Sequence, residues 1–221
     1  MPRGLFITGT DTGVGKTVVS AALMHRYRFA APLRYWKPIQ TGIEESDDTS
    51  EVAALGACDA GEICRTGIRL PRPVSPHLAA RSSGMTIEIQ PLLESIARER
   101  HRRTWIVEGA GGVLVPINPT QTMVDLMLAL DLPVLVVART ALGTINHTLL
   151  TLEALRHRTV RVAGVVMVGD PDADNKAAIQ HYGRVAVLGE LPRLAPLTPA
   201  ALQAWSVSEL DREGQLLTHL R

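Results

Sequence analysis

The chain has 221 residues, of which 46% are apolar, and its formal net charge is +1 at pH 7. This length is typical of one large domain with a buried core, and the near-zero charge argues against the strongly basic surface of a nucleic-acid-binding protein. No apolar run approaches the ~20 residues that span a bilayer, and the first apolar segment, at Leu5, follows no charged-then-apolar leader. We therefore expect one domain over residues 1–221, cytoplasmic, with neither nucleic acid nor a membrane as its partner.

The cysteine and charge patterns indicate no specific function. The spacing of Cys58 and Cys64 matches no common zinc-binding pattern, and the sequence has no second pair of His or Cys residues that would complete a zinc site with them. We expect both to be free thiols in a reducing compartment. The basic run "RERHRR" at residues 98–103 predicts the solvated end of a helix.

Apolar runs of strand length alternate with helical segments along the chain. The expected strands are Leu5–Thr8, Arg34–Lys37, Trp105–Glu108, Pro133–Ala138, Val162–Val168 and Val185–Leu188. The expected helices are Thr17–Tyr27, Thr49–Leu55, His77–Arg81, Ile89–Arg100, Thr122–Leu130, Asn146–Arg156 and Asn175–Tyr182. Several strands are apolar at nearly every position, as strands covered on both faces are. The alternation predicts an α/β fold, a mainly parallel sheet with helices on both faces and with the loops after the strands gathered at one edge.

Two stretches and the tail give weaker signals. Gly42–Asp48 and the proline-rich Arg69–Pro76 are expected to be irregular surface loops. The pattern fades after Pro192, and the tail from Ser206 is expected to form one last helix.

The stretch "FITGTDTGVGKT" predicts a phosphate-binding loop. An apolar strand leads into a turn of small residues and then into Gly15-Lys16-Thr17, which opens a helix. Backbone N–H groups and the helix N-terminus would face the phosphates, Lys16 would reach the β- and γ-phosphates, and the Thr17 hydroxyl would bind Mg²⁺. The spacing departs from the usual pattern, because Gly9 stands one residue too early and position 10 is Thr10.

Charged residues follow two other strands. Glu108 comes directly after the apolar "WIV", where an acid is costly unless it binds a metal or is paired, although it could also cap a turn. Asp47 and Asp48 lie in a polar loop and taken alone are typical of solvated acids. Lys37 ends the second strand before Pro38; it could neutralise charge in phosphoryl transfer or equally extend into solvent from a strand end.

Together these motifs resemble one enzyme family. "GTDTGVGKT", "KPIQTG", "VEGAGG", "LGTINHTLLTLEAL" and "LGELP" occur in the order and spacing of the ATP-dependent dethiobiotin synthetases, over roughly Phe6 to Pro192. The unusual loop spacing is the family's own. The resemblance implies a single-domain P-loop NTPase-like fold and a homodimer.

The resemblance also implies a reaction. CO₂ or bicarbonate carboxylates one amine of 7,8-diaminopelargonate, ATP phosphorylates the carbamate to a carbamic–phosphoric anhydride, and the second amine closes the ureido ring. Dethiobiotin, ADP and phosphate are the products, and Mg²⁺ is the cofactor. This chemistry needs cations around a phosphoryl group in transit and no covalent nucleophile, and no convincing Ser-His-Asp or Cys-His set is visible.

The matching positions carry roles over from the family. Lys16 and Lys37 would be catalytic, and Mg²⁺ would be held by Thr17, Asp48 and Glu108, with Asp48 preferred to Asp47 because it best matches the family's aspartate. Nucleotide would contact Thr12, Gly13, Val14, Gly15, Lys16, Thr17, Val168, Gly169, Gly189, Glu190, Leu191 and Pro192. Substrate would contact Thr41, Ser75, Gly111, Gly143, Thr144, Ile145 and Asn146.

Some of these assignments have alternatives. In the family, the segment Gly143–Asn146 reaches across the dimer to the substrate's carboxylate tail, and helix-start N–H groups suit a carboxylate; a plain helix cap explains the same residues. His77 would lie near the substrate amines or be structural, and we do not assign it as a base.

Two departures from the family concern the nucleotide. Gly13 stands where better-known members have Glu, and Val168-Gly169 stands where many have the Asn-Asp that reads adenine. The sequence therefore predicts a triphosphate site and leaves the base selectivity open.

Three other functions share parts of the pattern. Partitioning and cell-division ATPases carry an extra lysine early in their loop, where this chain has Asp11. Amidoligases of cobalamin synthesis usually carry a glutaminase domain, for which 221 residues leave no room. A nucleotide-binding module without catalysis would not need both Lys37 and Glu108.

Overall fold

The computed structural model of the protein describes residues 3–97 and 103–221. Within these residues the main sheet has seven strands in the order β4-β2-β6-β1-β7-β8-β9, and all the strand pairs are parallel. Its strands are β1 (Arg3–Gly9), β2 (Leu33–Trp36), β4 (Ile63–Cys64), β6 (Thr104–Gly112), β7 (Val134–Arg139), β8 (Val162–Val168) and β9 (Val187–Leu191). A second, two-stranded parallel sheet pairs β3 (Ile39–Thr41) with β5 (Ile68–Leu70). The predicted α/β fold class is confirmed.

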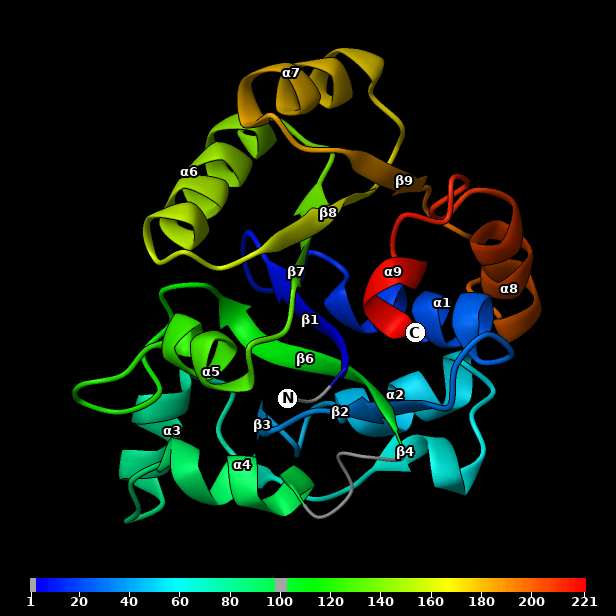
Figure 1. Cartoon of the computed structure of the whole chain (residues 1–221). Coiled ribbons are helices and arrows are strands. Elements are labelled where there is room, and N and C mark those ends of the chain that lie inside the picture. The colour runs from blue at the N-terminus through cyan, green and yellow to red at the C-terminus, as the bar shows by residue number, and fades with distance from the viewer. Residues whose placement is uncertain (1–2, 98–102) are drawn as a thin grey trace.

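Helices cover both faces of the main sheet (Figure 1). One face carries α1 (Lys16–Tyr27), α2 (Asp48–Leu55), α8 (Pro199–Ser208) and α9 (Leu217–Leu220). The other carries α3 (Pro76–Ser82), α4 (Ile89–Ala97), α5 (Met123–Leu130), α6 (Thr144–His157) and α7 (Ala173–Gly183). Within the described residues, no helix is both long and apolar enough to cross a membrane.

The central strands alternate between the two hydrophobic cores. In β1, Phe6 packs with the core under α3–α7, while Leu5 and Ile7 pack with the core under α1, α2, α8 and α9. All three side chains are fully buried. Burial on both faces explains why several of these strands are apolar at nearly every position. Because the strands are parallel, the loops that follow β1, β2 and β6 meet at one edge of the sheet.

Several predicted boundaries are wrong. Neither strand of the small sheet was expected: β5 overlaps the stretch Arg69–Pro76 predicted to be irregular, and β3 ends just before Gly42. Three-residue strands are too short for a clear alternation. The last long helix begins at Pro199 and ends at Ser208 instead of starting at Ser206, and its start follows a Thr198 N-cap with proline in the first turn. Strand β9 runs from Val187 to Leu191, later than expected, and β4 was not expected.

The prediction of free cysteines is confirmed, and the predictions for residues 98–102 fall outside the residues that the structure describes. Cys58 and Cys64 are both free thiols, as expected. The basic run at 98–103 lies, apart from Arg103, outside the described residues, as does the end of the helix predicted over Ile89–Arg100.

Candidate active site

A phosphate loop joins β1 to α1. Gly15 is the N-cap of α1 with a φ of 97°, a left-handed conformation that glycine adopts at little cost. Lys16 begins the helix, is only 7% exposed, and donates from its Nζ to the backbone carbonyl of Asp11 at 3.2 Å. Burial, with a further contribution from Lys37, lowers the pKa of Lys16 to about 8. The loop therefore keeps a poorly solvated ammonium beside free helix N–H groups, an arrangement suited to phosphate.

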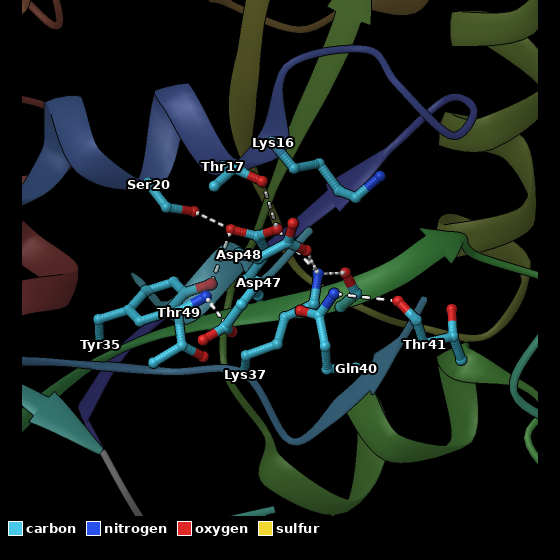
Figure 2. Close-up of polar contacts among 12 residues, drawn as sticks. Lys16, Thr17, Ser20, Tyr35, Lys37, Gln40, Thr41, Asp47, Asp48 and Thr49 are labelled. Atoms are coloured by element: carbon cyan, nitrogen blue, oxygen red, sulfur yellow. Dashed lines mark hydrogen bonds and ion pairs between the residues drawn. The ribbon is translucent and has the colours of Figure 1, made fainter. Parts of the chain in front are cut away.

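Glu108 is the buried centre of the site. It is fully buried on β6 and accepts hydrogen bonds from four side chains: Ser20 (2.8 Å), Lys37 (2.9 Å), Tyr35 (3.1 Å) and Thr17 (3.2 Å) (Figure 2). Burial and the Glu108 charge raise the pKa of Tyr35 well above its usual value, so this phenol stays a donor. The carboxylate is thus held in place by donors from α1, β2 and the chain just after β2.

Lys37 lies between two carboxylates. Its Nζ is 2.6 Å from Asp48 Oδ2 and 2.9 Å from Glu108 Oε1, and it also donates to the Gly109 carbonyl at 3.1 Å. Burial alone would lower the pKa of Lys37, but Glu108 and Asp48 outweigh it and hold the pKa above its ordinary value. Lys37 is therefore a charged, buried ammonium at neutral pH.

The two aspartates of the loop before α2 have different tasks. Asp47 is the N-cap of α2: its carboxylate accepts from Thr49 N at 3.1 Å and from Ser50 Oγ at 2.6 Å. Asp48 begins the helix and turns toward Lys37 (Figure 2). This geometry supports the choice of Asp48 over Asp47 as the acid of the site.

A cavity of about 580 Å³ brings much of the predicted site together. Lys16, Thr17, Lys37, Asp48 and Glu108 line it, together with Thr12, Gly13, Gly15, Thr41, Ser75 and Gly111. His77 is not among the lining residues; its Nδ1 is 3.2 Å from Ser75 Oγ, the lining hydroxyl.

The oxygen donors of the cavity suit Mg²⁺. Asp48 and Glu108 offer two carboxylates paired with the same ammonium, and Thr17 offers a hydroxyl 3.2 Å from Glu108 Oε1. Mg²⁺ prefers oxygen ligands, of which phosphates and water would supply the rest. In residues 3–97 and 103–221, no group of three or more His, Cys, Asp and Glu side chains is arranged to hold a metal ion alone.

Other predicted residues lie apart from this cavity. Gly143–Asn146, at the start of α6, do not line it; Thr144 Oγ1 donates to the Arg139 carbonyl, and Asn146 is exposed. A second hollow of about 530 Å³ lies near that helix and is lined by Thr12, Gly112, His147 and Leu150 among others.

The residues predicted to border the base do not line the cavity either. Val168 lies against the phosphate loop, since a Cβ on Gly15 would be 3.0 Å from its Cγ1. A Cβ on Gly169, whose φ is +133°, would be 2.3 Å from Thr140 Oγ1. The Glu190 carboxylate is paired with Lys176 at 2.8 Å. Among these residues the structure offers no free side-chain amide or carboxylate for a base.

Sequence reasoning missed two residues of the site. Ser20 and Tyr35 are buried donors to Glu108, and neither belongs to a recognised motif. The position of Ser20, one helical turn after Lys16, was the one available signal.

Fold and site together define a P-loop nucleotide-binding protein. A family profile described as AAA domain matches residues 3–201. A ParA family ATPase from Chlorobium tepidum superposes with a TM-score of 0.59 over 100% of this chain and 99% of its own, at 11% identity, which shows the shared fold.

The relatives in sequence are more specific. The ATP-dependent dethiobiotin synthetase BioD of Agrobacterium fabrum is 47% identical over 196 residues, 89% of each chain. That of Paramagnetospirillum magneticum is 48% identical over 200 residues, 90% of this chain and 93% of its own. The chain belongs to the ATP-dependent dethiobiotin synthetase family, as its motifs predicted.

Proposed function

We propose that the cavity carries out the dethiobiotin synthetase reaction of biotin biosynthesis. In this reaction 7,8-diaminopelargonate, CO₂ and ATP give dethiobiotin, ADP and phosphate, and residues 1–221 act as one domain. The observation that carries the proposal is the convergence of Lys16, Lys37, Asp48, Glu108 and Thr17 on one cavity at the edge where the parallel strands end. Family membership supports 7,8-diaminopelargonate as the diamine.

The two lysines would act on the phosphoryl group. Lys16, at the start of α1, would contact the β- and γ-phosphates together with the backbone N–H groups of the loop. Lys37 would turn from its carboxylates toward the phosphoryl group as charge develops during transfer to the carbamate. Both ammonium groups are poorly solvated in the structure, which strengthens their attraction to phosphate oxygens.

Thr17, Asp48 and Glu108 would hold Mg²⁺. When bound, the ion would neutralise charge on the phosphates. Ser20 and Tyr35 would keep the Glu108 carboxylate oriented, because each donates a hydrogen bond to it.

The remaining contacts would place the diamine. Thr41, Ser75 and Gly111 line the same cavity as Lys37 and would orient the two nitrogen atoms for ring closure. The protein would need no covalent nucleophile, since the second amine attacks the activated carbamate directly.

We also propose a homodimer in the cytoplasm, with the substrate tail bound across the interface. Leu114 and Leu150, which line the second hollow, are 60% and 56% exposed, and Leu142, just before the N-cap of α6, is 101% exposed. A second copy that covered them would also bring its α6 N-terminus, with Gly143–Asn146, toward the cavity. Isolated exposed leucines are ordinary, but a group beside a hollow is typical of an interface.

The test is direct synthesis. The protein is mixed with 7,8-diaminopelargonate, bicarbonate and Mg²⁺, with each of the four common nucleoside triphosphates in parallel tubes, and dethiobiotin is sought by mass spectrometry. Product confirms the function and ranks the bases. If folded protein hydrolyses ATP and forms no dethiobiotin in any tube, the biotin assignment is wrong and a switch ATPase becomes the better explanation.

A further inference from the structure

Arg69 connects two separate parts of the active site. It lies on β5, next to Gln40 of β3. Its Nη1 donates to the Lys37 carbonyl at 2.9 Å and to the Ile68 carbonyl at 3.3 Å, and its Nη2 donates to Thr49 Oγ1 at 3.1 Å. One side chain thus spans from the backbone of the ammonium residue to the first turn of the helix that begins with Asp48.

The geometry requires a guanidinium. Its planar fork presents N–H donors in fixed directions, so one group can serve two acceptors on different segments, which the point charge of a lysine cannot do equally well. Thr49 is 1% exposed, so the contact on α2 is made in the protein interior. Neither acceptor belongs to a flexible exposed side chain, and the bridge is therefore suited to fixing distances.

Gly67 leaves room for this bridge. A Cβ at position 67, where φ is +136°, would be 2.9 Å from the Lys37 carbonyl oxygen and 3.1 Å from Arg69 Nη1. It would also be 2.7 Å from the Pro38 carbonyl oxygen. The chain therefore has glycine at the point where a side chain would push the guanidinium away from Lys37.

The Arg69 bridge contacts the backbone of Lys37 and the residue after Asp48, and so reaches both sides of the Lys37–Asp48 ion pair. Lys37 Nζ and Asp48 Oδ2 are 2.6 Å apart. Lys37 follows β2 and Asp48 begins α2, so no strand pairing fixes the distance between their backbones. Figure 2 shows Thr49 beside this pair, next to Asp48 along the chain. Movement of α2 relative to the end of β2 would change the separation of these two groups.

We propose that Arg69 is a positioning residue that fixes the distance between Lys37 and Asp48 for phosphoryl transfer. The proposal builds on the proposed function, in which Lys37 is catalytic and Asp48 binds Mg²⁺. Arg69 itself does not line the cavity, so its effect would pass through Lys37 and Asp48.

Two variants and a matched control test it. Arg69→Met removes both contacts, and Thr49→Val removes only the Oγ1 acceptor while keeping the shape. Arg72→Met is the control, because the exposed Arg72 side chain donates to Ser82 Oγ at 2.6 Å and Arg72 does not line the cavity. We expect kcat for dethiobiotin to fall about ten- to hundred-fold in Arg69→Met, with KM for ATP changed about two-fold at most. Thr49→Val should show a smaller loss in kcat, and Arg72→Met none.

A second measurement does not depend on turnover. Hydrogen–deuterium exchange of the α2 amides, residues 48–55, should be about ten-fold faster in Arg69→Met than in wild type and in Arg72→Met. Arg69→Lys, which keeps the charge and loses the fork, should restore folding without restoring kcat. This variant carries the test if Arg69→Met does not fold.

Either of two results overturns the proposal. One is a lower Tm with wild-type kcat in the Arg69 variants, which would make Arg69 structural only. The other is unchanged α2 exchange in Arg69→Met. If wild type itself makes no dethiobiotin, the proposed function fails, and the exchange experiment still decides whether Arg69 fixes α2.

Discussion

Replacement of Lys37 by methionine should destabilise the metal-free protein and make its stability depend on Mg²⁺. The ammonium is the cation between Asp48 and Glu108, at 2.6 and 2.9 Å. Its loss leaves two carboxylates facing each other, one of them fully buried. The same oxygens form the proposed Mg²⁺ site, so the ion and the ammonium compete for them.

The structure sets the size of the effect. Removal of one partner from a buried pair costs about 3–5 kcal/mol. The lower end applies because Glu108 keeps three hydroxyl donors and the Asp48 side chain is 21% exposed. A loss of about 3 kcal/mol corresponds to a fall in Tm of roughly 6–12 °C for a protein of this size.

The assay is thermal unfolding with and without Mg²⁺. In wild type, Mg²⁺ must displace Lys37 and should raise Tm little; in Lys37→Met it should restore a large part of the loss. Lys176→Met is the matched control, because the Lys176–Glu190 pair at 2.8 Å is partly exposed and its loss should cost below about 1 kcal/mol. Equal Tm values for Lys37→Met and wild type without metal, or the same response of both to Mg²⁺, would refute the reasoning.

Three further predictions concern the nucleotide, the base site and the interface. In the nucleotide-free protein Lys16 has a pKa of about 8, and phosphate binding needs its charged form, so nucleotide affinity measured by calorimetry should fall about ten-fold per pH unit above 8. Lys16→Arg should give an affinity that does not change with pH, and a pH-independent affinity in wild type would contradict the assignment. Gly169→Ala should cost roughly 1–3 kcal/mol in urea unfolding, since the new Cβ meets Thr140 and φ is +133°; a wild-type midpoint would show that the loop adapts freely. Leu142→Asp should convert a dimer to monomer in analytical ultracentrifugation, while Leu197→Asp, away from the second hollow, should not; a dimer that survives the first change lies on another surface.

The phosphate loop and the core strands could be predicted from sequence because their signals are local. Gly15-Lys16-Thr17 follows directly on a strand, and strands such as β7 and β8 are continuous apolar runs between polar turns. The start of α8 carries a local signal of the same kind, a Thr198 N-cap followed by Pro199 in the first turn.

The hydrogen bonds and ion pairs within the site could not be predicted, because they join segments that are distant in the sequence. Ser20 and Tyr35 look like ordinary core-facing residues until the fold places Glu108 beside them, 88 and 73 positions away in the chain. Arg69 occupies a three-residue strand with no pattern of its own. The distinct roles of Asp47 and Asp48 likewise follow from where α2 begins.

The close approach of Gly169 to Thr140 constrains the order in which this chain can acquire substitutions. A base-reading side chain at position 169 meets the Thr140 hydroxyl and an unfavourable backbone conformation at once. Replacement of Thr140 by a smaller residue removes the first obstacle. Along an evolutionary path, the change at 140 therefore precedes the change at 169, and each position constrains which residues the other accepts. Laboratory selection for a different base should recover the pair in that sequence, with single changes at 169 rare among folded survivors.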